Sequence, residues 1–177
     1  MELMKERVDS PALPSATVVL LRDGADGLEV FLLKRHGLSD VLGGAYVFPG
    51  GKVDAEDAEW AGRTDCAPAQ LHALLAEPDL SPDQAAALFV TAIREAFEET
   101  GVLFADVSAD QARADWAALR AGPRFGELLE GRAVRLLASR LHPWSRWVTP
   151  TLASVSRKRF DTRFFLATVP EGQDATH

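Results

Sequence analysis

The hydrophobic positions along the chain fall first into three short β-rich runs. Segments 16–23 (ATVVLLRD) and 28–35 (LEVFLLKR) are joined by a Gly- and Asp-rich connection, which indicates a hairpin or a short loop. Segment 45–48 (AYVF) is a third predicted strand, and it ends at a Pro-Gly-Gly sequence. The preceding residues 1–14 contain two prolines and are expected to form a loose leader.

The pattern then changes to a helical period. Ser81 suits the N-cap, Pro82 suits the first helical position, and Gln84 completes a capping box. The helix is predicted to run through Thr100 and to stop at Gly101, because glycine favours the position just past a helix. At about 100° per residue, one apolar face collects Phe89, Ile93, Ala96 and Phe97.

Further segments add both strands and helices. We predict a short helix at 67–76, surface helices at 110–121 and 124–130, and strands at 101–107, 141–148 and 160–169. Because these elements show no regular strand–helix–strand repetition, they favour an α+β or α/β sandwich. A length of 177 residues suits a single core, so residues 15–177 are predicted to form one domain.

Composition excludes several classes of partner. The net charge of −7 argues against nucleic acid, because an acidic protein does not attract phosphate through its overall field. No apolar run reaches about 18 residues, which argues against a membrane span, and the N-terminus has no apolar signal-peptide core. The single cysteine, Cys66, fits a reducing cytoplasm, where we expect the protein to reside.

Three carboxylates on the long helix carry the most informative chemistry. Glu95, Glu98 and Glu99 are spaced i, i+3 and i+4, so they share the face opposite the apolar stripe. Their mutual repulsion and their place in the last turns, where the helix dipole disfavours negative charge, both cost stability. Mg²⁺ or Mn²⁺ would offset this cost, since hard cations prefer oxygen ligands. The alternative is a solvated acidic face on which Arg94 pairs with a neighbour.

The segment before this helix favours the metal site. Segment 48–54 (FPGGKVD) contains Gly50 and Gly51, and glycines let the backbone approach a ligand closely. Their carbonyl oxygens are also suitable metal ligands. Taken by itself, the same segment would be read as an ordinary turn.

Together these segments resemble the signature of the Nudix hydrolases, G-x5-E-x7-R-E-U-x-E-E-x-G-U, in which U is a bulky apolar residue. Segment 94–102 (REAFEETGV) matches the second half of the signature, and Gly51 matches its first glycine. Asp57 stands where the first Glu belongs. The segment 58–93 replaces the seven residues that follow in the signature, so we expect an insertion at about 58–80.

One branch of the Nudix superfamily, the coenzyme A diphosphatases, carries a similar break. The resemblance to that branch covers about residues 16–169, most clearly in the segments FPGGKVDAED, AIREAFEETGVL, WSRWVTP and RFDTRFFLA. It implies a Nudix-type sandwich of a mixed β-sheet between helices. The family normally continues with another strand and helix, which this chain is expected to lack after 160–169.

The resemblance also implies roles for the signature residues. The ligands of Mg²⁺ or Mn²⁺ would be Glu95, Glu98, Glu99 and the carbonyl of Gly50. Arg94 would orient a glutamate or tie the loop to the helix, with Asp57 as the expected partner. Glu98 would act as the catalytic base.

The implied substrate is a small molecule with a diphosphate linkage. Coenzyme A or an acyl-CoA would yield 3′,5′-ADP and phosphopantetheine or its acyl form. Arginines suit phosphate recognition, and the candidates are Arg35, Arg159 and Arg163. Trp147, with Trp144 nearby, is expected to stack on an adenine or line an acyl pocket, although core packing competes for one of the two.

Other functions stay open at this point. The substrate could instead be ADP-ribose or another nucleotide sugar. The chain could also be a Nudix-fold binding module without catalysis, although such a module has no need for clustered acids. The oligomeric state is open as well, with a homodimer as one option.

Overall fold

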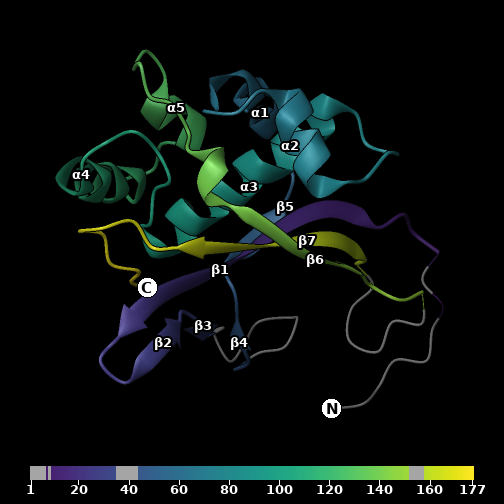
Figure 1. Ribbon diagram of the computed structural model, residues 1–177, viewed down its shortest axis with the longest axis horizontal. Helices are drawn as coiled ribbons and strands as arrows, with labels where there is room; N and C mark the ends of the chain where they lie inside the picture. Colours follow the sequence, from purple (N-terminus) through teal and green to yellow (C-terminus); the bar gives the residue numbers. More distant parts are fainter. Residues whose placement is uncertain (1–6, 8, 35–43, 152–157) are drawn as a thin grey trace.

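A mixed β-sheet forms the centre of the fold (Figure 1). The computed structural model describes residues 7, 9–34, 44–151 and 158–177. The main sheet has the order β2–β1–β7–β6, with β5 also paired to β1, and β3 and β4 form a separate pair. The strands are β1 (Leu13–Gly24), β2 (Gly27–Val30), β3 (Leu33–Lys34), β4 (Tyr46–Val47), β5 (Gly50–Lys52), β6 (His142–Val148) and β7 (Phe160–Thr168).

The helices lie together on one side of this sheet. Figure 1 shows all the labelled helices on the same side of β1, β7 and β6. Within the described residues the sheet therefore has one helical layer, whereas the resemblance implied a layer on each face. The helical elements are α1 (Ala55–Glu59), η1 (Ala61–Arg63), α2 (Pro68–Leu75), α3 (Pro82–Thr100), α4 (Ala109–Leu119), α5 (Phe125–Leu129) and η2 (Ala138–Arg140).

The pairing of β1 with β7 defines two faces of the sheet. The two strands are parallel, while β1 pairs with β2 and β5, and β6 with β7, in antiparallel fashion. The mixed α+β class predicted from the sequence is therefore confirmed. Alternate residues point to opposite faces, and the helix-covered face is buried at Ala16, Val18, Leu20, Arg163, Phe165 and Ala167.

The long helix α3 joins the sheet to the helical layer. Its predicted start is confirmed, because the Ser81 hydroxyl accepts a hydrogen bond from the Gln84 amide and the Gln84 side chain accepts one from the Ser81 amide. Its end at Gly101 is also confirmed, with φ +78°. The ring of Phe89 lies 4.7 Å from that of Phe165, centroid to centroid. All four residues of the predicted apolar stripe are fully buried.

The segment 58–80, predicted to be an insertion, contains the end of α1, η1 and α2, and it lies beside α3. The short helix expected at 67–76 is confirmed as α2, and the predicted surface helices and last two strands are confirmed as α4, α5, β6 and β7. β1 begins at Leu13, inside the predicted leader. No helix in the described part of the chain is both long and apolar enough to cross a membrane.

Two strand predictions were wrong in detail. Segment 28–35 divides into β2, which pairs with β1, and β3, which pairs with β4. Segment 101–107 is buried at 102–105 but forms no strand there, with an isolated bridge between Ala105 and Leu136. The side-chain amide of Gln173 takes the place of a neighbouring strand there, since it accepts from the Leu103 amide at 2.8 Å and donates to the Leu103 carbonyl at 3.0 Å.

Candidate functional site

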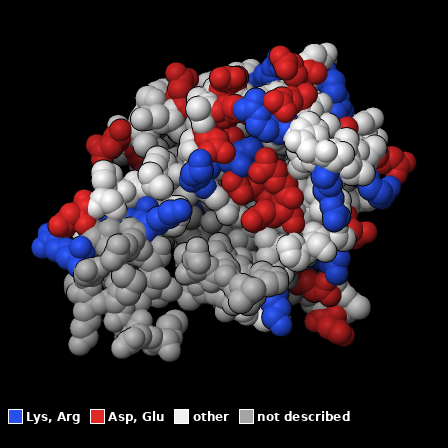
Figure 2. Space-filling model, turned by 180° about the vertical axis from the view of Figure 1, so that it is seen from behind, with Lys and Arg blue, Asp and Glu red and all other residues white. Residues whose placement is uncertain are grey.

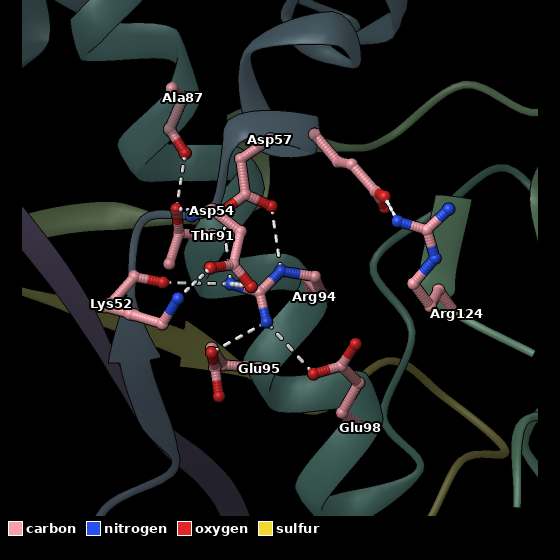
Figure 3. Close-up of polar contacts among 10 residues, drawn as sticks. Lys52, Asp54, Asp57, Ala87, Thr91, Arg94, Glu95, Glu98 and Arg124 are labelled. Atoms are coloured by element: carbon pink, nitrogen blue, oxygen red, sulfur yellow. Dashed lines mark hydrogen bonds and ion pairs between the residues drawn. The ribbon is translucent and has the colours of Figure 1, made fainter. Parts of the chain in front are cut away.

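Arg94 joins the two halves of the signature. From α3, its guanidinium donates to both carboxylate oxygens of Asp57, with Nε–Oδ1 at 2.8 Å and Nη2–Oδ2 at 3.1 Å. The same Nη2 donates to the backbone carbonyl of Lys52 at 3.0 Å. Figure 3 shows Arg94 in the middle of these groups. The arginine therefore ties the strand β5 and the helix α1 to α3.

Asp57 is held from several directions and is only 1% exposed. Its carboxylate accepts from the backbone amide of Asp54 at 2.9 Å and completes the capping box of α1. The Thr91 hydroxyl on α3 lies 2.8 Å from the Oδ2 atom of Asp57. A buried carboxylate requires such partners, and the short side chain of Asp57 reaches them because α1 lies directly against α3.

The three glutamates lie around Arg94 and the Gly-Gly segment. One oxygen of Glu95 and one of Glu98 accept hydrogen bonds from the same Arg94 Nη1, at 2.7 Å and 3.0 Å. A carboxylate oxygen of Glu99 accepts from the Gly50 amide at 3.0 Å. The structure thus brings Gly50 next to the glutamates predicted to share a metal with it.

Burial shapes the electrostatics of this cluster. Desolvation raises the pKa of Glu95 to about 7, although the charge of Arg94 acts in the opposite direction. Desolvation also raises the pKa of Glu98, again against Arg94. Burial by itself would lower the pKa of Arg94, but its hydrogen bond to Asp57 and the charges of Glu95, Asp57 and Glu98 raise it overall. Burial therefore favours the protonated forms of Glu95 and Glu98 unless a further cation compensates their charge.

The two glycines make room for this arrangement. A Cβ atom on Gly51 would lie 2.2 Å from the Oε1 atom of Glu95. A Cβ atom on Gly50 would lie 2.6 Å from the backbone carbonyl oxygen of Ala16. Only glycine permits β5 to lie this close both to the α3 carboxylate and to β1.

The donor set fits a hard divalent cation. Carboxylate oxygens and a backbone carbonyl are the ligands that Mg²⁺ and Mn²⁺ prefer. Glu95 and Glu98 each accept a hydrogen bond from Arg94 through one carboxylate oxygen. Across the described residues, no three acidic, histidine or cysteine side chains already converge as metal ligands. The fit therefore rests on the chemistry of the donors and on the space left by Gly51.

The predicted substrate arginines have different surroundings. Arg163 is 3% exposed, and its guanidinium donates to both carboxylate oxygens of Glu77, at 3.0 Å and 2.6 Å. Arg159 donates to the backbone carbonyls of Thr149 and Ser10. These contacts favour structural roles for both. Arg35 lies outside the described residues.

The side chains of Trp147 and Trp144 are 63% and 61% exposed. The alternative prediction, that one of the two packs in the core, is therefore wrong. Both side chains lie on β6, at the edge of the sheet. The sequence pattern did not identify Thr91 as a partner of Asp57 or Glu77 as a partner of Arg163. The i, i+3 spacing of Thr91 and Arg94 places both side chains on one helical face, and this spacing could have indicated Thr91. No sequence signal indicated Glu77, because its partner Arg163 is distant in the sequence.

Comparisons with known proteins agree on one family. A family model described as the NUDT19 Nudix domain matches residues 67–177. The chain is 31% identical to the human (Homo sapiens) acyl-coenzyme A diphosphatase NUDT19, an alignment that covers 83% of this chain and 49% of that protein. The chicken (Gallus gallus) protein of the same name is 30% identical, with 85% and 54% covered. The chain thus spans about half the length of these curated relatives.

A solved structure supports the same relationship. The crystal structure of a NUDIX hydrolase from Alicyclobacillus acidocaldarius is 32% identical to this chain, with a TM-score of 0.67. The match covers 95% of this chain and 73% of that structure. The similarity therefore includes the strands and helices that position Arg94 and the glutamates.

Proposed function

Because the chain belongs to the Nudix family of the NUDT19 type, we propose that it hydrolyses a diphosphate linkage in a nucleoside diphosphate derivative. The observation that carries this proposal is the cluster around Arg94. It gathers Glu95, Glu98 and Glu99 beside Gly50, so that four carboxylates, with Asp57, lie around one guanidinium. A binding module or a solvated acidic face has no need for carboxylates clustered against a buried arginine, because their partial desolvation costs free energy unless it is compensated.

The residues that would hold Mg²⁺ or Mn²⁺ are Glu95, Glu98, Glu99 and the carbonyl of Gly50. When bound, such an ion neutralises diphosphate charge and favours deprotonation of water. Arg94 is a positioning residue in this proposal, because it holds the carboxylates through Nη1 and contacts β5 and α1 through its other nitrogens. The rigid contacts around Asp57 keep that arrangement fixed before substrate arrives.

Glu98 is the proposed general base. Of the two glutamates bonded to Arg94, Glu98 is the more exposed, with 33% of its side chain accessible against 13% for Glu95. Water would lose its proton to Glu98 as its oxygen bonds to one phosphorus, and the bridging P–O bond would break. The two products would be a pair of phosphate monoesters.

The proposed substrate is coenzyme A or an acyl-CoA, cleaved to 3′,5′-ADP and phosphopantetheine or its acyl form. Support comes from the names of the curated relatives, acyl-coenzyme A diphosphatases, and from the segment 58–93 that separates Asp57 from Arg94 in the sequence. ADP-ribose or another nucleotide sugar is the competing substrate class within the same chemistry.

A substrate panel tests the proposal. Purified protein with Mg²⁺ or Mn²⁺ should convert coenzyme A to two products identifiable by mass, and the conversion should stop when a chelator is added. ADP-ribose, NADH and dinucleoside polyphosphates complete the panel. Faster cleavage of ADP-ribose would overturn the substrate but keep the reaction, whereas no cleavage of any member would overturn the enzymatic function.

Two substitutions test the carboxylates directly. Glu98→Gln and Glu99→Gln should each reduce turnover by roughly 10²-fold or more, as removal of a key charge-stabilising group does. Both variants should fold, because each change removes charge from a repelling cluster. Glu127→Gln, an exposed acidic residue on α5, is the matched control and should keep the wild-type rate. Turnover near the wild-type rate in both site variants would contradict a metal site there.

A further inference from the structure

Figure 1 shows one face of the sheet without a helix, and the strand register places a row of polar and aromatic residues from four strands on that face. Ser15 of β1 lies opposite Lys52 of β5 on one side and opposite Thr162 of β7 on the other. Thr162 in turn lies opposite Trp147 of β6. Cross-strand partners point to the same face, so the order across the sheet is Lys52, Ser15, Thr162, Trp147.

Direct contacts agree with this register. The hydroxyls of Ser15 and Thr162 are 2.8 Å apart, which places both on one face. That face is opposite the buried one, because Ala16 and Arg163 are the helix-side neighbours of these two residues. At about 4.8 Å per strand, the row is about 14 Å long.

A cavity of about 380 Å³ is lined by Lys52, Ser15 and Thr162 of this row and by Lys158, while Trp147 lies outside its lining. Leu13 and Phe160 form its apolar end, and Lys52 and Gly50 line its other end. Gly50 is the residue whose amide donates to Glu99 at 3.0 Å. The cavity therefore borders the β5 segment whose other contacts are with the glutamates of α3.

The two ends of the row have complementary chemistry. Lys52 has 62% of its side chain exposed, and its ammonium contacts Asp54 at the margin of the cavity. Trp147 is 63% exposed at the far end, although large aromatic side chains are usually well buried. A cation at one end and an exposed indole at the other match the phosphate and the base of a nucleotide, and the hydroxyl pair between them, in which Ser15 is 4% exposed, forms the floor.

We propose that this row is the nucleotide-binding platform, in which Lys52 binds a phosphate and Trp147 stacks on the base. This inference rests on the proposed function, because it names how the same site would hold its substrate. It also assigns phosphate recognition to a lysine on β5 rather than to Arg159 or Arg163, whose guanidinium groups are engaged with protein atoms.

The roles of Lys52 and Trp147 can be tested separately. Calorimetry without divalent metal would measure the equilibrium binding of ADP and of inorganic diphosphate. Trp147→Ala should weaken ADP binding by roughly 5- to 100-fold, as loss of one base–aromatic stack does, and should leave inorganic diphosphate unaffected. Trp147→Phe should restore most of the ADP affinity. Lys52→Ala should weaken both ligands, whereas Asp54→Asn, which releases Lys52 from its partner, should weaken neither.

Trp144→Ala is the matched control. Trp144 is as exposed as Trp147 and lies on the same strand, but the bulge between Pro143 and Ser145 takes it out of the register. Equal effects of the two tryptophan substitutions, or no effect of either, would overturn the platform. ADP binding that depends on Trp147 in a protein that cleaves nothing would support the platform and overturn the hydrolytic function. Coenzyme A cleavage with an unchanged KM in Trp147→Ala would support the hydrolytic function and overturn the platform.

Discussion

At the scale of single residues, the two adjacent glycines of β5 have different neighbours. A side chain at Gly51 would meet the end of the Glu95 side chain, which can rotate away. A side chain at Gly50 would meet backbone atoms of Ala16 and Thr17, which cannot. The same substitution at the two positions therefore has different consequences.

We predict that Gly51→Ala keeps its fold but loses metal affinity and turnover, because the carboxylate of Glu95 must move from its position. Gly50→Ala should instead lower the free energy of unfolding by about 1–3 kcal/mol, the usual cost of overpacking. Thermal unfolding and metal titration of both variants check this. Equal losses of stability would contradict the assignment of Gly51 to the site.

Arg94 and Asp57 form the buried ion pair of the site, with side-chain exposures of 8% and 1%. Removal of one partner leaves an uncompensated buried charge, which typically costs about 3–5 kcal/mol. We predict losses of this order for Arg94→Gln and for Asp57→Asn, and a smaller loss in the double variant than the sum of the two. Denaturant unfolding of the three variants gives the coupling energy, and additive losses would show that the pair is not coupled.

At the scale of secondary-structure elements, the sequence predicted what depends on local contacts. The boundaries of α3 follow from Ser81, Gln84 and Gly101, which are all adjacent to the ends that they define. The strand at 101–107 was wrong because buried apolar residues look alike in a strand and in an irregular core segment. The Leu103 backbone bonds the side chain of Gln173, which lies 70 residues away, beyond the reach of any local pattern.

The candidate site was predictable to the same extent. The i, i+3, i+4 spacing placed the glutamates on one face of α3, and the family resemblance paired Arg94 with Asp57. The environment of Arg163 was not predictable, because Glu77 lies between α2 and α3 and reaches β7 only in the folded chain. The exposure of Trp144 and Trp147 depends similarly on β6 being an edge strand.

The contact between Glu77 and Arg163 ties the insertion to β7. Arg146 of β6 also lies 3.0 Å from Glu77, and both arginines contact Asp161. We predict that Arg163→Gln lowers the free energy of unfolding by about 1.5–3 kcal/mol, the range for hydrogen bonds to charged groups, with KM for the substrate unchanged. Arg140→Gln, a change to an exposed arginine in η2, is the control for stability. A raised KM without loss of stability would restore the substrate role of Arg163.

At the scale of the whole molecule, negative charge is the problem that the site must solve. The chain carries a net charge of −7, and Figure 2 shows acidic side chains gathered on the face seen from behind, with basic side chains among them. Such a field repels an anionic diphosphate. Attraction must therefore come from local cations, which are Lys52 in the proposed platform and the metal in the proposed site.

The same excess charge predicts how the whole domain responds to metal. A ligand that binds only the folded state at 100 times its Kd adds about 2.7 kcal/mol of stability, which for a chain of this length raises Tm by about 5–10 °C. We expect Mg²⁺ or Mn²⁺ to produce such a shift in differential scanning calorimetry, and NaCl at equal ionic strength to produce little. The shift should shrink in the double variant Glu98→Gln/Glu99→Gln and persist in Glu127→Gln. Equal shifts with NaCl and Mg²⁺ would mean that general screening, rather than a bound cation, relieves the repulsion around Arg94.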